Sequence, residues 1–199
     1  MNVDEVKRRL IAVCDAVIAA QDRLTKADQA IGDGDHGVGM ARGFTAARQA
    51  LATKPAASVG DLFKTMGMAI LMKAGGASGA VFGTFFNAKA KALPATNLDQ
   101  PSFAQALNDA IAAVQSRGGA KAGGKTMLDA ALPAAQAAAS ATTLAEALSM
   151  AAAAAADGAT ATAAMIATTG KAKTLGERSL GHMDPGAISL SIIFAAFSG

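Results

Sequence analysis

The 199-residue sequence predicts an all-α protein, and three observations lead to this expectation. Hydrophobic residues make up 52% of the chain but aromatic residues only 4%, so Ala, Leu, Ile, Val and Met must build most of the core. Alanine, which is abundant here, has the highest helix propensity of all residues. Apolar residues also recur at intervals of three and four, as in amphipathic helices, and no segment shows a convincing strand-like alternation.

About eight helices are expected in order along the chain. The first carries one apolar stripe over residues 3–24, and Asp4 and Glu5 in its first turn complement the helix dipole. The glycine pair 75–76 ends the third helix, and Pro101 opens the fifth. The other helices are expected to span about 37–52 and 77–91, and to start near residues 58, 126, 143 and 185.

The helix that starts near residue 143 is rich in alanine. Thr143 and Glu146 form a capping-box pattern at its start, and Asp157-Gly158 marks a candidate break inside it. We expect the alanines of residues 135–164 to form closely packed helices. No linker of useful length divides the chain, so residues 1–199 are expected to form a single domain.

Composition and charge exclude several classes of protein. Cys14 is the single cysteine, which excludes a disulfide-stapled secreted fold, and its apolar neighbours predict a buried thiol. The net charge of +3 comes without a basic stripe interleaved with aromatic residues, so no nucleic-acid partner is expected. Neither a signal peptide nor a membrane-spanning run is visible, so we expect a cytoplasmic protein without membrane contact.

Four breaks between the expected helices are unusually rich in glycine and polar residues. They follow the first, third, fifth and seventh helices, and alternate loops of an antiparallel bundle lie at the same end. We therefore expect one composite site formed by residues 28–40, 75–79, 118–126 and 170–186.

The first break concentrates three carboxylates. Asp28, Asp33 and Asp35 lie within eight residues, and like charges this close repel unless a cation or hydrogen-bond donors compensate. All-oxygen ligands suit Mg²⁺, which completes its shell with water and phosphate oxygens, whereas a solvated Asp-Gly turn is the alternative. His36 suits a hydrogen bond toward a phosphate, or else it merely caps the following helix.

The other breaks supply the elements of an anion site. Residues 75–79 place N–H groups at a helix start, although such glycines also simply end helices. Residues 123–126 resemble the end of a P-loop but lack the preceding strand, so we reject that interpretation. The cations of residues 171–178 could bind a polyphosphate held between them and the aspartates. Alternatively, they simply belong to a solvated basic loop. Together these features predict a Mg-nucleotide site for phosphoryl transfer.

Four motifs appear in sequence order across most of the chain. They are Ile31-Gly-Asp-Gly-Asp-His-Gly37, Gly75-Gly-Ala-Ser-Gly79, Gly124-Lys-Thr-Met127 and Leu175-Gly-Glu-Arg-Ser-x-Gly-His-x-Asp-Pro-Gly186. In combination they resemble the nucleotide-binding subunit family of dihydroxyacetone kinases (DhaL- or DAK2-type). The resemblance implies a barrel-like bundle of eight antiparallel helices with the nucleotide site at one end.

The resemblance also implies roles for individual residues. Two Mg²⁺ ions would be held by Asp28, Asp33 and Asp35, and no side chain is assigned a catalytic role because the bound nucleotide carries the phosphoryl group. Gly119, Thr126 and Met127 would lie near the base and sugar. The full set expected to contact ADP or ATP is His36, Gly37, Val38, Gly39, Ala77, Ser78, Gly119, Thr126, Met127, Lys171, Arg178, Asp184, Pro185 and Gly186.

By the same resemblance, the chain is expected to be a kinase subunit that needs partners. A phosphotransferase-system protein (DhaM-type) would phosphorylate the bound Mg-ADP. The phosphoryl group would then pass to dihydroxyacetone, or a related small ketose, on a separate substrate-binding subunit (DhaK-type). An ATP-dependent kinase domain for another small sugar and a nucleotide-binding regulatory module stay open as alternatives. A homodimer, formed through the apolar first and last helices, also stays open.

Three segments depart from the family's pattern, and one of these departures, Ala27 in place of Leu before Asp28, should matter little. Gly39 stands where an Asn is expected, which removes one contact to the nucleotide, and Gly123-Gly124 replaces a Gly-Asp pair before Lys125. Such differences fit a paralogue that acts on another small substrate, for example a four-carbon ketose.

Overall fold

The computed structural model describes residues 1–90, 93–94 and 96–199. In this part of the chain the regular structure is helical, apart from one isolated antiparallel bridge between Asn2 and Asn97, which confirms the predicted fold class. The elements are α1 (Val3–Ala19), α2 (Gln21–Ile31), α3 (His36–Thr53), α4 (Val59–Lys73), α5 (Gly76–Lys89), α6 (Gln100–Gly118), α7 (Leu128–Ser140), α8 (Leu144–Ala161), η1 (Thr162–Ala164), η2 (Lys171–Ser179) and α9 (Pro185–Ser198).

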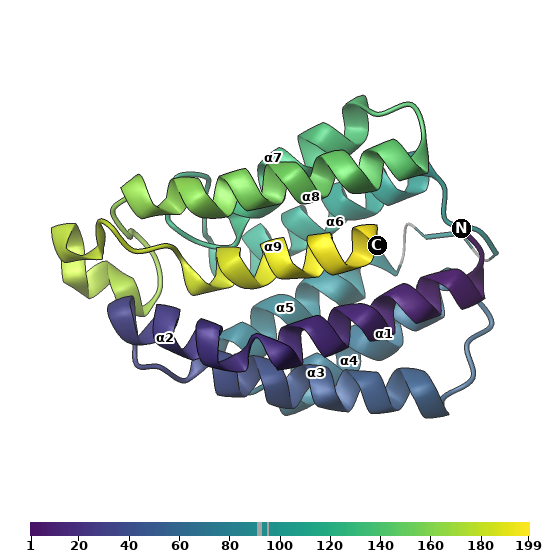
Figure 1. Ribbon diagram of the computed structural model, residues 1–199, viewed down its shortest axis with the longest axis horizontal. Coiled ribbons are helices and arrows are strands. Elements are labelled where there is room, and N and C mark those ends of the chain that lie inside the picture. The colour runs from purple at the N-terminus through teal and green to yellow at the C-terminus, as the bar shows by residue number, and fades with distance from the viewer. Residues whose placement is uncertain (91–92, 95) are drawn as a thin grey trace.

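Helices α1 and α3 to α9 form a closed ring, as Figure 1 shows. From α3 onward each helix packs against the next one, and α9 closes the ring between α8 and α1, which in turn packs against α3. Neighbours in the ring run in opposite directions, so the expected barrel-like antiparallel bundle is confirmed. Helix α2 is an addition at one end of this barrel, where it contacts α3, α9 and η2.

The first expected helix is in fact two helices. Helix α1 ends at Ala19 and α2 begins at Gln21, and the apolar stripe continues across this junction without a glycine or proline to mark it. The change of direction brings α2 against the start of α3 at Gly37. A Cβ atom there would lie 2.3 Å from the carbonyl oxygen of Gln21, so only glycine permits this approach.

The candidate break at Asp157-Gly158 is wrong, because α8 continues through it to Ala161. Gly158 faces α7, and a Cβ atom at this position would lie 2.3 Å from the carbonyl oxygen of Asp129. The glycine therefore allows two helix backbones to approach closely, and it stays inside a helix because packing outweighs its low propensity.

The other predicted helix starts agree with the structure to within a few residues. Ser58 and Thr143 accept hydrogen bonds from the N–H groups of Asp61 and Glu146, so both act as N-caps. The end predicted for the fourth helix, Lys91, lies outside the described residues. Cys14 is buried as expected, and burial raises the pKa of its thiol to about 12. Among the described residues, the helices are too short or too polar to cross a bilayer.

A buried lysine lies in the aromatic part of the core, at the far end of α5 from its start at Gly76. Lys89 is only 5% exposed, and its Nζ lies 4.1 Å from the ring centroid of Phe85. The rings of Phe63, Phe86 and Phe194 also face this ammonium at 5.3 to 5.7 Å. Burial lowers the pKa of Lys89 to about 7, because the charged form loses its hydration.

Candidate functional site

The four polar breaks meet around one cavity of about 360 Å³. They converge at the end of the barrel that carries α2 and η2 (Figure 1). The structure thus brings together segments separated by up to about 150 residues, as the antiparallel topology predicted. Among the residues proposed from the sequence, those that line the cavity are Asp28, Asp33, Asp35, His36, Ala77, Ser78, Thr126, Met127, Lys171, Asp184, Pro185 and Gly186.

Five residues of the expected nucleotide set do not line this cavity. Gly37 and Gly39 are buried in packing contacts of α3, and a Cβ atom at Gly39 would lie 3.1 Å from the carbonyl oxygen of Ala74. A side chain at this position would therefore require Ala74 to shift by a few tenths of an ångström. The three others are Val38, Gly119 and Arg178.

Apolar residues form much of the cavity wall, and sequence reasoning missed them. Val81 and Phe82 come from α5 one turn after Ser78, and Val114 comes from the last turns of α6. Their positions follow from the helical repeat, since residues three and four apart share one face of a helix. An apolar wall beside polar groups is typical of a small-molecule site and suits the flat face of a nucleotide base.

The three aspartates form a compact carboxylate cluster. One oxygen each from Asp28, Asp33 and Asp35 lies within 4.8 Å of the others. The ammonium of Lys171, at the start of η2, donates to the carboxylates of both Asp33 and Asp35. This hydrogen bond lowers the pKa of Asp33 and raises that of Lys171. Asp33 is thus ionised, and a cation from a segment distant in sequence partly neutralises the cluster.

His36 connects the carboxylates to the rest of the barrel. Its backbone N–H donates to Oδ2 of Asp28 over 3.1 Å. Its ring lies between two serines, with Nδ1 2.8 Å from Oγ of Ser78 and Nε2 2.8 Å from Oγ of Ser189. The residue is 6% exposed, and burial lowers the pKa of the ring, so the imidazole is neutral near pH 7.

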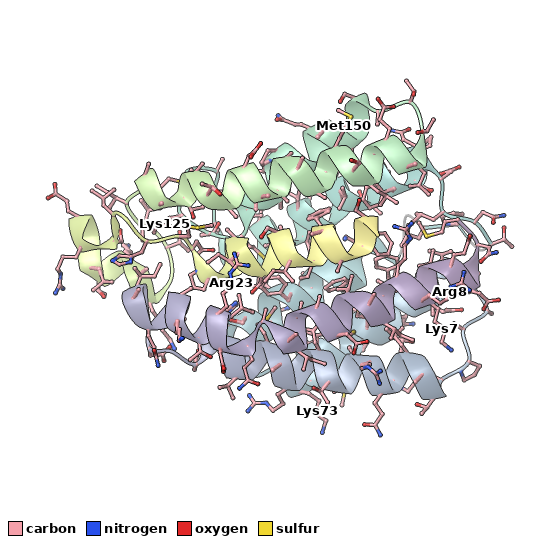
Figure 2. All side chains as sticks on the ribbon, viewed as in Figure 1. Lys7, Arg8, Arg23, Lys73, Lys125 and Met150 are labelled. Carbon is pink, nitrogen blue, oxygen red and sulfur yellow. The ribbon has the colours of Figure 1, made fainter. Side chains whose placement is uncertain are left out.

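Lys125 anchors the loop that precedes α7. The residue is 1% exposed, and Nζ donates to the carbonyl oxygens of Thr162, Met165 and His182 at 2.5 to 3.1 Å. Figure 2 places it between the end of α8 and the start of α9. A lysine fully occupied by carbonyls in this way positions the surrounding loops, which agrees with the rejection of a P-loop.

Two further aspartates fix the loops around the cavity. Asp129 accepts from the N–H groups of Gly123 and Thr126 at 2.5 and 2.8 Å. Asp184 caps α9 by accepting from the N–H of Ala187 over 2.7 Å. Burial raises the pKa of Asp184 to about 7, so this carboxyl gains a proton more easily than an exposed one.

The residues present fit Mg²⁺ better than a softer metal. The cluster offers only carboxylate oxygens, it is partly open to solvent, and a cavity lies beside it for further oxygen ligands. His36 does not compete as a ligand, because both of its ring nitrogens are hydrogen-bonded to serines. Zinc, which prefers nitrogen and sulfur ligands, is disfavoured on the same grounds.

Comparison with known proteins agrees with this geometry. Residues 30–199 match the model of the DAK2 domain family. The ADP-binding subunit DhaL of PEP-dependent dihydroxyacetone kinase 1 from Listeria innocua is 38% identical over 173 residues, which cover 87% of this chain and 84% of that protein. The corresponding subunit from Escherichia coli is 38% identical over 172 residues, which cover 84% of this chain and 82% of that protein.

Longer relatives match this chain over about a third of their length. D-erythrulose kinase from Mycolicibacterium smegmatis is 39% identical over 194 residues, which cover 94% of this chain and 33% of that protein. The crystal structure of the dihydroxyacetone kinase of C. freundii with AMP-PNP and Mg²⁺ superposes with a TM-score of 0.75 at 27% identity, covering 97% of this chain and 33% of that one. From its motifs, its closed helical barrel and these similarities, the chain belongs to the DAK2 domain family of dihydroxyacetone kinase nucleotide-binding subunits.

Proposed function

We propose that this chain is the ADP-binding subunit of a kinase for dihydroxyacetone or a related small ketose. The observation that carries the proposal is the cavity in which Asp28, Asp33 and Asp35 lie together at one end of the barrel. The relatives named DhaL match it over more than four-fifths of their length, which supports a subunit of the same extent and role.

In this proposal the three aspartates hold two Mg²⁺ ions, and the cavity holds ADP. Bound Mg²⁺ supplies charge neutralisation and orientation of the phosphate oxygens. The N–H groups of Ala77 and Ser78 at the start of α5 would donate to phosphate, and Lys171 would add a positive charge next to it. Thr126 and Met127 would bound the base and sugar, with Pro185 and Gly186 completing the pocket.

The proposed phosphoryl path requires two partners. A phosphotransferase-system protein would phosphorylate the bound ADP, and a separate subunit would present the ketose. Both steps need access to the phosphate end of the cavity, which agrees with the half-exposed carboxylates of Asp33 and Asp35. The basic residues Lys7 and Arg8 lie at the other end of the barrel (Figure 2), so they are not part of this site.

A second candidate function is a kinase that exchanges free ATP and acts on a four-carbon ketose. The similarity to D-erythrulose kinase over 194 residues favours it, since that protein carries the same region within a longer chain. A regulatory nucleotide-binding module is the third possibility, because the same pocket would serve it.

Native mass spectrometry of gently purified protein tests the proposal. A mass increment of ADP with two Mg²⁺ is expected for the wild type and should be lost in Asp33→Asn, whereas Asp22→Asn on the exposed start of α2 should retain it. Protein that purifies empty but binds Mg-ATP reversibly would favour the ATP-dependent kinase. Absence of any nucleotide binding would refute all three functions.

A further inference from the structure

We propose that Ser189 is a positioning residue of the nucleotide site, which acts through His36 on the hydroxyl group of Ser78. The proposal rests on the proposed function, since it concerns the same cavity. Ser189 is 0% exposed and does not line the cavity, so it cannot contact a nucleotide directly. Its effect must pass through another residue.

The three side chains form a continuous hydrogen-bonded chain. Oγ of Ser189, on the inner face of α9, lies 2.8 Å from Nε2 of His36. On the other side of the ring, Nδ1 lies 2.8 Å from Oγ of Ser78, which lines the cavity. The chain therefore runs from the barrel interior to the cavity wall, and the imidazole joins α9 to the start of α5.

The neutral ring couples the directions of these two hydrogen bonds. A neutral imidazole donates at one nitrogen and accepts at the other, whereas a serine hydroxyl can take either role, so one serine accepts from the ring and the other donates to it. In this proposal the proton lies on Nε2 and Ser189 is its acceptor. Nδ1 then accepts, and the donor is the hydroxyl of Ser78.

This direction determines what Ser78 offers to a ligand. Because its proton is directed to Nδ1, its oxygen presents lone pairs to the cavity and serves as an acceptor, for example for water bound to a cation. Phosphate oxygens need donors, and these come from the N–H groups at the start of α5. If Ser189 is removed, Nε2 loses its hydroxyl partner, the ring turns more freely, and the orientation of Ser78 is no longer fixed.

A double-mutant cycle separates this role from a purely structural one. Ser189→Ala and Ser78→Ala should each weaken Mg-ADP binding about fivefold, as expected for one hydrogen bond, measured by isothermal titration calorimetry. The double variant should bind as weakly as either single variant, because both remove the same arrangement. If the two substitutions acted independently, the double variant would bind about 25-fold more weakly than the wild type, and this result would overturn the proposal. An unchanged affinity of Ser189→Ala would also overturn it.

Ser191→Ala is the matched control. Ser191 lies on the same helix, but its hydroxyl donates to the carbonyl of Ile188 and does not reach His36. This variant should bind Mg-ADP like the wild type. Thermal melts of the four variants and the wild type, followed by circular dichroism, would establish that they fold.

Nitrogen NMR of the imidazoles gives a readout that does not depend on nucleotide. The chain has two histidines, so the ¹⁵N signals of His36 are readily separated from those of exposed His182. The ligand-free wild type should show the Nε2–H tautomer, and Ser189→Ala should shift His36 toward a mixture of tautomers. An Nδ1–H tautomer in the wild type, or no change in Ser189→Ala, would refute the hydrogen-bonded chain. Failure of the wild type to bind Mg-ADP would refute the proposed function instead.

Discussion

Replacement of Lys89 by methionine should stabilise the protein near neutral pH. The pKa of this lysine falls from 10.5 to about 7 because of burial, and that difference corresponds to a cost of about 5 kcal/mol for keeping the charge in the core. Part of the cost is offset by the aromatic rings, of which Phe85 is nearest at 4.1 Å, with about 2 kcal/mol for a desolvated cation–π contact. Lys89→Met should therefore gain about 2–3 kcal/mol at pH 7.

The pH dependence of stability provides a second and more specific test. Between pH 7 and 10.5 the unfolded state binds more protons at residue 89 than the folded state, so wild-type stability should rise with pH. The slope from this group is about 1.4 kcal/mol per pH unit. In Lys89→Met this contribution disappears, and the gap between the two proteins should narrow as the pH increases.

Urea unfolding at pH 7, 8 and 9 measures both quantities. Lys64→Met, at an exposed position of α4, should change stability by no more than about 0.5 kcal/mol and serves as the control. If Lys89→Met were no more stable than the wild type at pH 7, or if the gap stayed constant to pH 9, the assignment of a buried and weakly basic lysine would be wrong.

Three further changes address the site and the packing that supports it. Asp33→Asn should weaken Mg-ADP binding by roughly 100-fold or more, because it removes an ionised carboxylate from the proposed Mg²⁺ site, and calorimetric titration would measure it. Gly158→Ala should destabilise the protein by about 3 kcal/mol, since its Cβ atom would meet the backbone of Asp129, and urea unfolding would show it. Lys125→Met should cost about 3 kcal/mol or more in the same assay, because three carbonyl oxygens lose a charged donor.

Matched variants make these outcomes decisive. Asp22→Asn removes a carboxylate from the exposed start of α2 and should bind Mg-ADP normally. Gly118→Ala adds a methyl group where nothing lies within 4 Å, so its stability should change little. Lys121→Met removes an exposed charge from the same loop as Lys125. If a control variant lost as much affinity or stability as its test variant, the local contact named for the test variant would not be the cause of that loss.

The fold was largely predictable because apolar periodicity and capping residues act locally. Thr143 and Ser58 mark helix starts in the sequence and cap helices in the structure. The division of the first helix was not predictable, because no breaker stands at Ala20 and the change of direction depends on how α2 meets α3. The helix break predicted at Gly158 was wrong for the opposite reason. A glycine that is required by close packing against a neighbouring helix has the same appearance in sequence as a glycine that ends a helix.

The site was predictable where charge and glycine cluster in sequence. Asp28, Asp33 and Asp35 stand close together in the chain, and topology placed them opposite the start of α5. The contacts of Lys125 and Ser189 were not predicted because their partners are distant in sequence, such as the carbonyl of His182 for the lysine and the ring of His36 for the serine. Such contacts depend on the closed barrel and leave no local pattern.

The position of α2 outside the closed ring has a kinetic consequence. Segments that open without disrupting the main core do so at a lower free energy than global unfolding. Helix α2 carries Asp28, and the loop after it carries Asp33 and Asp35, while the eight-helix ring is complete without them. Detachment of α2 and η2 would therefore release the carboxylates from the ring, at the cost of exposing Leu24, which α2 buries in the core. Residence time of a bound nucleotide would then follow this local opening, which amide hydrogen exchange can follow residue by residue.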